Sequence, residues 1–303
     1  MDHQLSSSSY GLRVPAQDQL QRDKPTSFKA VAWTLIAAMA LAAILLLNYW
    51  ASYQPLSTLA YSGIVLSLCG LANVVVPFRF LGVRKRAVGA IILAGGLGLA
   101  IAALLWPASM IRVAQHRTLL DDIMPEYQFN ERHAARVHAR PEQVMEAIRQ
   151  ATWGDMTSLA TLLKIRGAVL RIPSHEGSAL PQDQRMLDGF AASGYVFGGS
   201  EHEILMCGGA NMRAKGPLQV HTLQEFADYR EPGAVKIAFD FNVADVGGGW
   251  STVSAETRVA VQKDFSRGPA IYWRLVVPGS GLLRREWLEG IKRRAESMPN
   301  PRP

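Results

Sequence analysis

The sequence predicts an α+β domain that follows a membrane region of three helical spans. Three observations predict it. Long apolar runs without a charged residue occupy the first third of the chain, segments within residues 235–262 alternate apolar and polar side chains, and an amphipathic helical stretch ends the chain. The charges are divided in the same way, because residues 1–111 hold eight Lys or Arg and three Asp or Glu, and the later residues hold 24 and 22. A fully soluble protein is therefore excluded.

The first apolar run covers residues 30–50. At ~1.5 Å rise per residue a helix of this length reaches about 31 Å, which is enough to cross the hydrocarbon core of a bilayer. Similar runs cover residues 56–78 and 87–110. A buried core helix is the alternative for each run, and these lengths without a charge disfavour it. We therefore expect three transmembrane helices within residues 28–111, preceded by a disordered tail at residues 1–27.

The short loops between the runs set the expected orientation. Four Lys or Arg precede the first run, residues 51–55 carry none, and residues 79–86 carry four. The positive-inside rule places the N-terminus and the 79–86 loop in the cytoplasm. Three crossings then make the chain a multi-pass protein of the plasma (inner) membrane with an extracytoplasmic domain. The side reverses if the second run, which contains Asn73 and Pro77, enters the bilayer without crossing it.

Gly95, Gly96 and Gly98 lie together in the third apolar run. A pattern search for phosphate-binding loops would select them. In a membrane helix, however, small residues typically allow a second helix to approach closely. We therefore expect these glycines to serve helix packing.

Beyond the membrane region, residues 112–125 are expected to form a helical continuation or linker, residues 126–297 the soluble domain, and residues 298–303 a disordered tail. Periodicity and turn residues predict the elements of the domain in order. They are a strand at 128–139, helices at 141–151, 156–165 and 183–192, strands at 195–197 and 203–207, a short helix at 221–229, strands at 235–243 and 252–262, and helical pieces at 269–277 and 282–297. Pro278-Gly279-Ser280-Gly281 is expected to interrupt the last helix.

Two strands carry the apolar rows that define the expected interior. Successive side chains of a strand point to opposite faces, so each alternating segment presents one apolar face, which we expect to turn inward onto the C-terminal helix. Their inward residues are Val235, Ile237, Phe239, Phe241, Val253, Val259 and Val261. Glu131 and His133 share a face of the first strand with Phe129. They either orient a ligand inside an apolar pocket or lie near the strand end in contact with water, and the sequence favours contact with water.

Two segments resemble a known superfamily. They are FADYREPGAVKIAFDFNV at 226–243, and TRV at 257–259 followed by IYWRLVVPGSGLLRREWLEGIKRRAE at 271–296. Together with the order of elements they are similar to the helix-grip (START-like, SRPBCC) superfamily, which includes polyketide cyclases/dehydrases and lipid-transport domains. The resemblance covers about residues 126–297. It implies a curved antiparallel sheet wrapped on a long, kinked C-terminal helix and a cavity for a hydrophobic ligand. The three spans before the domain depart from the usual soluble form.

The sequence offers little catalytic or metal-binding chemistry. Gly279-Ser280-Gly281 does not follow a strand-to-helix elbow, so a break between helical pieces is favoured over a nucleophile. No two of the seven histidines have helical metal-ligand spacing, and the two cysteines, Cys69 and Cys207, lie in different halves of the chain. We therefore expect no catalytic residue, no metal and no cofactor. An enzymatic role is left open and is not favoured.

The last helix carries several basic residues. We expect them to form a solvated surface with a favourable helix-dipole contribution, and contact with anionic lipid headgroups is the sharper alternative. Nucleic-acid binding is not expected, because the domain is nearly balanced in charge and no aromatic residues interleave with a basic stripe. These basic residues are Arg284, Arg285, Lys292, Arg293 and Arg294.

Three functions remain. The first is a membrane-anchored binder of a lipid-like or other hydrophobic small molecule, with the bilayer as its second partner. The second is a membrane scaffold whose domain binds a protein that the sequence does not identify. The third is a cyclase- or hydrolase-like enzyme. An interior filled by Phe239, Phe241, Trp273 and Trp287 would favour the scaffold, and at least two titratable side chains converging there would be needed for the enzyme.

Overall fold

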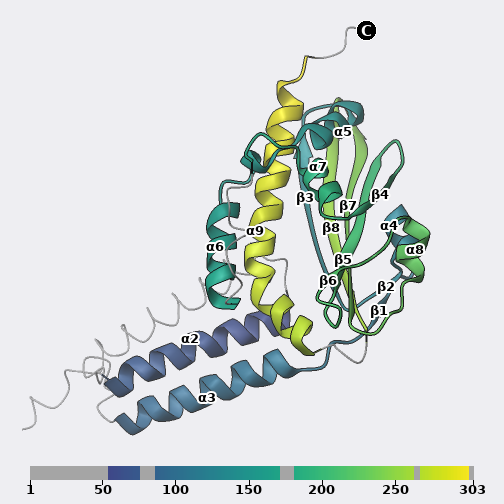
Figure 1. Cartoon of the computed structure of the whole chain (residues 1–303). Helices are drawn as coiled ribbons and strands as arrows, with labels where there is room; N and C mark the ends of the chain where they lie inside the picture. The colour runs from purple at the N-terminus through teal and green to yellow at the C-terminus, as the bar shows by residue number, and fades with distance from the viewer. Residues whose placement is uncertain (1–53, 76–85, 171–180, 263–266, 300–303) are drawn as a thin grey trace, which may run out of the picture.

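The structure is a computed structural model that describes residues 54–75, 86–170, 181–262 and 267–299 (Figure 1). The run expected to form the first span, at residues 30–50, lies outside the described residues. So do the expected N-terminal tail at 1–27 and most of the expected C-terminal tail.

Two apolar helices, α2 (Pro55–Val75) and α3 (Arg86–Leu105), pack side by side at one end of the molecule (Figure 1). Both are long and apolar enough to cross a membrane. Their backbones approach closely, since a Cβ atom on Gly96 would lie 2.6 Å from the backbone nitrogen of Ser67. The same construction finds no atom within 4 Å at Gly95 or Gly98. Of the three clustered glycines, Gly96 is thus the one at the contact.

The domain is built on a six-stranded antiparallel sheet of order β3-β8-β7-β5-β4, with β6 paired to β5. The alternating segments form the two longest strands, and their register places Phe239 opposite Thr257 and Val243 opposite Val253. Their apolar rows therefore share one face of the sheet. The strands are β3 (Phe129–Val137), β4 (Val196–Gly199), β5 (Glu203–Asn211), β6 (Gly216–Pro217), β7 (Ala234–Gly247) and β8 (Trp250–Val261).

Helices cover both faces of this sheet (Figure 1). The long helix α9 (Arg267–Ser297) runs along the inner face, where α5 (Pro141–Gln150), α7 (Met186–Ala192) and residues near the 3-10 turn Trp153–Asp155 join it in one apolar cluster. The helix α6 (Leu159–Leu170) lies beside α9. The short helices α4 (Leu119–Ile123) and α8 (Leu223–Asp228) pack on the outer face. A curved antiparallel sheet with one long C-terminal helix is compatible with a helix-grip fold.

Helix α9 corrects one expectation. It continues through Pro278 as a single helix, although Figure 1 shows its first turns bent away from the axis of the rest. Proline cannot donate to the carbonyl four residues earlier, which bends a helix without always ending it. Both sides of the bend are held by packing, because Trp273 and Val277 lie in one apolar cluster and Trp287 and Ile291 in another.

Other boundaries also differ from expectation, among them the end of β5 at Asn211 and the end of β7 at Gly247, four residues later than expected in each case. Helix α6 runs to Leu170 through Gly167, where the sequence predicted an end at Ile165. An internal glycine costs a helix only about 1 kcal/mol, which flanking residues can offset. The expected linker at 112–125 is not a helical continuation of the membrane region. It contains α4 and ends beside a two-stranded ladder of β1 (Ile111–Arg112) and β2 (Glu126–Tyr127).

Candidate functional site

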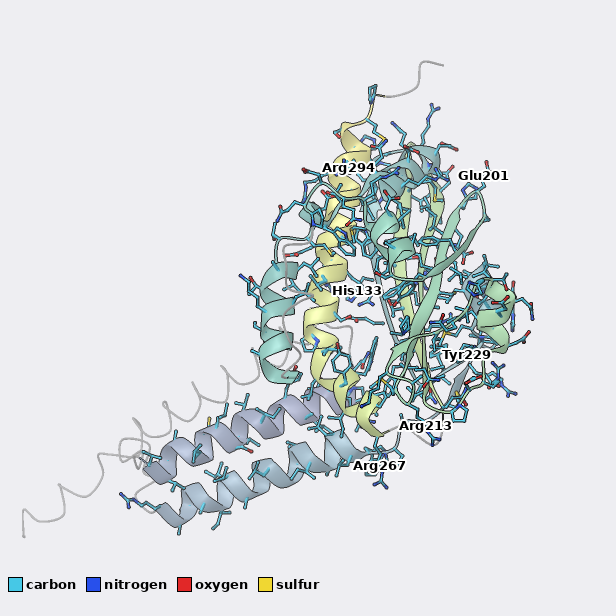
Figure 2. The ribbon with its side chains drawn as sticks, in the orientation of Figure 1. His133, Glu201, Arg213, Tyr229, Arg267 and Arg294 are labelled. Carbon is cyan, nitrogen blue, oxygen red and sulfur yellow. The ribbon has the colours of Figure 1, made fainter. Side chains whose placement is uncertain are left out.

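A group of polar side chains lies between the sheet and α9, and all of its members except the partly exposed Ser280 are buried. It consists of Glu131 and His133 on β3, Thr257 on β8, and Ser280 and Arg284 on α9, and is called the inner polar cluster below. Strand pairing places Glu131 directly opposite Thr257 on the inner face. Figure 2 shows His133 between the sheet and α9.

The inner polar cluster is held by an ion pair. The Arg284 guanidinium donates to Glu131 Oε2 at 2.9 Å and to Thr257 Oγ1 at 3.0 Å. It also donates to the backbone carbonyl of Ser280 at 3.2 Å and contacts the Ser280 hydroxyl. The other carboxylate oxygen of Glu131 lies 2.9 Å from His133 Nε2. Each Glu131 oxygen thus has a partner, as a carboxylate that is 1% exposed requires.

Burial lowers the pKa of the Arg284 guanidinium, and the neighbouring Glu131 carboxylate opposes that change. Guanidinium has so high an intrinsic pKa that Arg284 stays charged in this position. The inner polar cluster therefore places a cation–carboxylate pair, with an imidazole on the carboxylate, inside an otherwise apolar layer. Such groups can orient a polar end of a bound molecule.

Aromatic side chains flank the inner polar cluster on both sides. Phe241 and Trp287 pack edge to face with ring centroids 4.6 Å apart, and Phe190 lies 5.4 Å from Phe239. On the side nearer the apolar helices α2 and α3, Trp273 packs on Phe129 at 5.9 Å. The space between the sheet and α9 is thus filled by rings at two places, with the charged group between them.

The centre of the inner face is less covered than its surroundings. Ile237 and Phe239 lie on the inner side of β7, a strand inside the sheet, and both remain partly exposed. Their neighbours on the outer side, Lys236, Ala238 and Asp240, are buried. The Arg284 guanidinium carbon lies 5.7 Å from the Phe239 ring centroid. Accessible apolar surface therefore adjoins the inner polar cluster.

Two tryptophan indole groups on α9 lack hydrogen-bond partners among the described residues. In the part of the chain that the structure describes, the indole N–H groups of Trp273 and Trp287 make no hydrogen bond, although these side chains are 7% and 6% exposed. Buried donors normally find an acceptor in the protein, in water or in a ligand. An acceptor from outside the described residues, such as a water or a bound molecule, would satisfy these two indole N–H groups.

The nine residues expected to line the interior all lie on the inner face. Glu131 and His133 are buried there, so the expectation that they touch water near the strand end is wrong. They sit in the middle of β3, and Arg284 of α9 reaches down to Glu131. The other seven are Val235, Phe241, Val253, Val259 and Val261, which are buried, and Ile237 and Phe239, which are partly exposed.

The helical pattern predicted that Arg284 lies on a solvated surface of the last helix, and this prediction is wrong. It is 7% exposed. A signal was present, since Arg284 falls three residues before Trp287 and seven before Ile291, on the apolar stripe of the helix. The C-terminal end of α9 lies away from the two apolar helices (Figure 1). Figure 2 shows Arg294 at the end of α9 far from α2 and α3, where it pairs with Asp155 at 2.9 Å.

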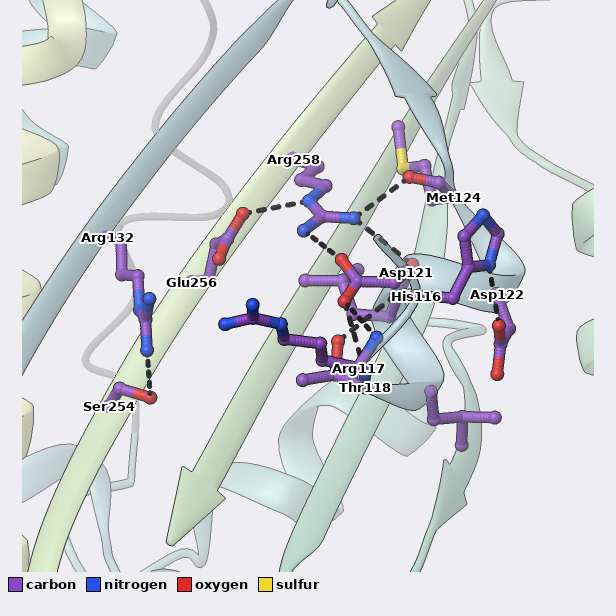
Figure 3. Close-up of polar contacts among 12 residues, drawn as sticks. His116, Arg117, Thr118, Asp121, Asp122, Met124, Arg132, Ser254, Glu256 and Arg258 are labelled. Carbon is purple, nitrogen blue, oxygen red and sulfur yellow. Dashed lines mark hydrogen bonds and ion pairs between the residues drawn. The ribbon is translucent and has the colours of Figure 1, made fainter. Parts of the chain in front are cut away.

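A second polar group occupies the outer face of the sheet (Figure 3). Arg258 on β8 pairs with Asp121 of α4 at 2.6 Å and with Glu256 at 2.8 Å, and it donates to the carbonyl of Met124 at 3.1 Å. Its guanidinium carbon also lies 4.8 Å from the Tyr127 ring centroid. These contacts fasten the segment that leaves α3 onto the sheet, so we assign them a structural role.

The described part of the chain offers few side chains that could bind a metal ion or act as a nucleophile. Within residues 54–75, 86–170, 181–262 and 267–299, no group of three or more His, Cys, Asp or Glu side chains is arranged to hold a metal ion. The Ser280 hydroxyl contacts Arg284, and the imidazole of His133 is on Glu131. A guanidinium cannot accept a proton from a hydroxyl, so the contact with Arg284 does not activate Ser280 as a nucleophile.

Comparison of the chain with protein-family models, with curated proteins and with solved structures found no match.

Proposed function

We propose that the chain is a membrane-anchored binding protein for a lipid-like or other hydrophobic small molecule that carries one polar group. The observation that carries this proposal is the partial exposure of Ile237 and Phe239 at the centre of the inner face, beside Glu131 and Arg284. Accessible apolar surface beside a few convergent polar groups is what a small-molecule site provides.

The chemistry of the surroundings supports an amphipathic ligand over a purely apolar one. Apolar burial contributes about 0.8 kcal/mol per methylene, but a bilayer offers an alkyl chain the same gain. A binding domain beside a membrane therefore needs a polar contact that lipid tails cannot supply. The inner polar cluster and the unpaired indole N–H of Trp287 would supply it.

A membrane scaffold is the second candidate, and the contact between Phe241 and Trp287 favours it, because these rings fill part of the interior. An enzyme is the third candidate, and it would use the Glu131 carboxylate and the His133 imidazole, which lie in contact. The Ser280 hydroxyl contacts the Arg284 guanidinium, a cation that cannot act as a general base, so a hydrolase is the weakest of the three.

We further propose that α2 and α3 both cross the bilayer. The start of α2 and the end of α3 lie next to the domain, because Gln54 donates to the carbonyl of Asn130 and Arg274 donates to the carbonyl of Leu104. The residues that join these helices at their other ends, 76–85, include three Lys or Arg, and Arg86 follows them. The positive-inside rule then places the domain outside the cytoplasm.

The ligand proposal is tested on the full chain in nanodiscs, with a fluorescent C16 fatty-acid analogue as the probe. Ile237→Trp fills the accessible centre of the inner face and should weaken probe binding about tenfold or more. Val246→Trp, at the exposed far end of the same strand β7, is the matched control and should bind as wild type. If wild type binds no more probe than empty nanodiscs do, or if a folded Ile237→Trp variant binds normally, the scaffold function is favoured instead.

A further inference from the structure

Arg274 is a buried cation on the bent first part of α9. Its side chain is 2% exposed, and it donates to the backbone carbonyl of Leu104 at 2.6 Å. Leu104 belongs to the last turn of α3, whose final carbonyls have no partner within the helix. Arg274 therefore meets the negative end of the α3 dipole.

A single carbonyl acceptor offsets only a small part of the free-energy cost of burying the Arg274 guanidinium. Among the described residues no carboxylate forms an ion pair with Arg274, whereas Arg258 and Arg284, which are buried similarly, each pair with at least one. Removing a charge from water costs several kcal/mol unless an opposite charge compensates it. Burial accordingly lowers the pKa of Arg274, and no charge of the described residues opposes that change. A negatively charged group beside Arg274 would therefore stabilise its buried charge.

The location of Arg274 indicates where that anion would come from. The Tyr61 hydroxyl donates to the carbonyl of Leu275, so this part of α9 lies on the first turns of α2 as well as on the end of α3. Trp106, directly after α3, is 61% exposed, as is typical of an aromatic side chain at a membrane interface. Arg267 lies seven residues before Arg274, on the same side of the helix, and Figure 2 shows it beside the end of α3.

We propose that Arg274 binds the phosphate group of an anionic phospholipid at the membrane surface where α3 ends, with Arg267 as the outer basic residue. Guanidinium suits this role because its planar N–H groups match phosphate oxygens in pairs. The proposal rests on the crossing of the bilayer by α2 and α3 and is independent of a ligand at the inner face.

The test compares full-length protein in nanodiscs made of phosphatidylcholine alone and of phosphatidylcholine with phosphatidylglycerol. Wild type should melt at a higher temperature in the anionic nanodiscs and should retain phosphatidylglycerol preferentially in native mass spectra. Arg274→Gln should lower that preference about fivefold, the effect expected for one basic residue at a lipid surface. Arg293→Gln is the matched control, because it removes the same charge from the exposed far end of α9 and should retain the preference.

A lysine variant and added phosphate distinguish a lipid site from a helix cap and from a site for free phosphate. Arg274→Lys should keep most of the anionic-lipid preference even if the α3 contact is weakened. Inorganic phosphate at millimolar concentration should leave the preference unchanged if the site takes a lipid, and should abolish it if the site takes free phosphate. An equal loss of melting temperature for Arg274→Gln in both nanodiscs, with an unchanged lipid preference, would show a structural cap on α3 and overturn the proposal. Failure of the chain to insert into membranes at all would instead contradict the proposed crossing.

Discussion

The ion pair between Glu131 and Arg284 joins β3 to α9 through an apolar layer, so its two charges depend on each other. Removing one partner of a buried pair leaves an uncompensated charge, which costs about 3–5 kcal/mol. We expect Glu131→Gln to lower the free energy of unfolding by about that amount. Glu131→Gln combined with Arg284→Met should be less destabilising than the sum of the two single changes. Denaturation of the full chain in detergent, followed by circular dichroism, measures this cycle.

The exposed pair of Arg112 and Glu126 is the control for that cycle. Its side chains are 78% and 44% exposed, and exposed pairs contribute about 0–1 kcal/mol. Glu126→Gln should therefore leave stability nearly unchanged. Additive effects of Glu131→Gln and Arg284→Met would mean that the two charges are not coupled, and the inner polar cluster would lose its central contact.

Asp240 makes stability depend on pH. Burial raises its pKa to about 8, with the Glu203 and Glu256 carboxylates adding to the effect, and its Oδ1 has no hydrogen-bond partner among the described residues. The unfolded chain releases this proton near pH 4 and the folded chain near pH 8. Stability is therefore lost as the pH rises through that window, by at most about 1.4 kcal/mol per pH unit. Asp240→Asn, which cannot ionise, should be more stable than wild type at pH 8.

That gain should shrink toward pH 5, and melting temperatures of wild type and variant at the two pH values measure it. Lys236, whose pKa burial lowers to about 8, also changes charge near the upper pH value, but it is present in both proteins, so its contribution cancels in the comparison. The exposed Asp183→Asn is the control and should show no pH-dependent difference. A variant that is no more stable at pH 8 than at pH 5, relative to wild type, would mean that Asp240 is ionised in the folded protein.

At the scale of elements, the contact between α2 and α3 involves Gly96 and does not involve Gly95. A Cβ atom at Gly96 would overlap the backbone of α2, and at Gly95 it would meet nothing within 4 Å. Gly96→Leu should therefore separate the two helices, whereas Gly95→Leu places an apolar side chain on the outer surface of α3. We expect the first variant to lower the melting temperature of the full chain by many degrees and the second to change it little. Equal effects of the two substitutions would contradict the helix pairing.

Elements with a strict local period were predictable, and those decided by tertiary contact were not. The alternation within Val235–Val243 and within residues 252–262 predicted the correct inward face of β7 and β8, because successive side chains of a strand point to opposite faces. The uninterrupted path of α9 through Pro278 was not predictable, because the packing of Trp273 and Trp287 on different clusters decides it.

The candidate site was predictable in part for the same reason. Strand geometry correctly placed Glu131 and His133 on one face of β3 with Phe129, but the sequence favoured contact with water there and did not predict that this face is buried. It did not place Arg284 with them, because a charged residue on a helix is normally solvated, and its burial here depends on a carboxylate 153 residues away.

At the scale of the whole molecule, the proposed crossing of the bilayer by α2 and α3 determines which segments share a side of the membrane. Because the start of α2 and the end of α3 both contact the domain, that crossing would put residues near 54 and 106 on the domain's side, and Val75 and Arg86 on the other. This arrangement does not depend on whether residues 30–50 form a further span. We expect the domain outside the cytoplasm, since Lys and Arg in short loops remain inside.

Single cysteines at Met212, which is 45% exposed, and at Arg84 should distinguish the two sides in a chain whose native Cys69 and Cys207 are replaced by serine. A membrane-impermeant maleimide should label the Met212→Cys protein in right-side-out vesicles and the Arg84→Cys protein in inverted vesicles. The reverse labelling would place the domain in the cytoplasm, and labelling of both proteins in the same vesicles would mean that α2 and α3 do not cross the bilayer.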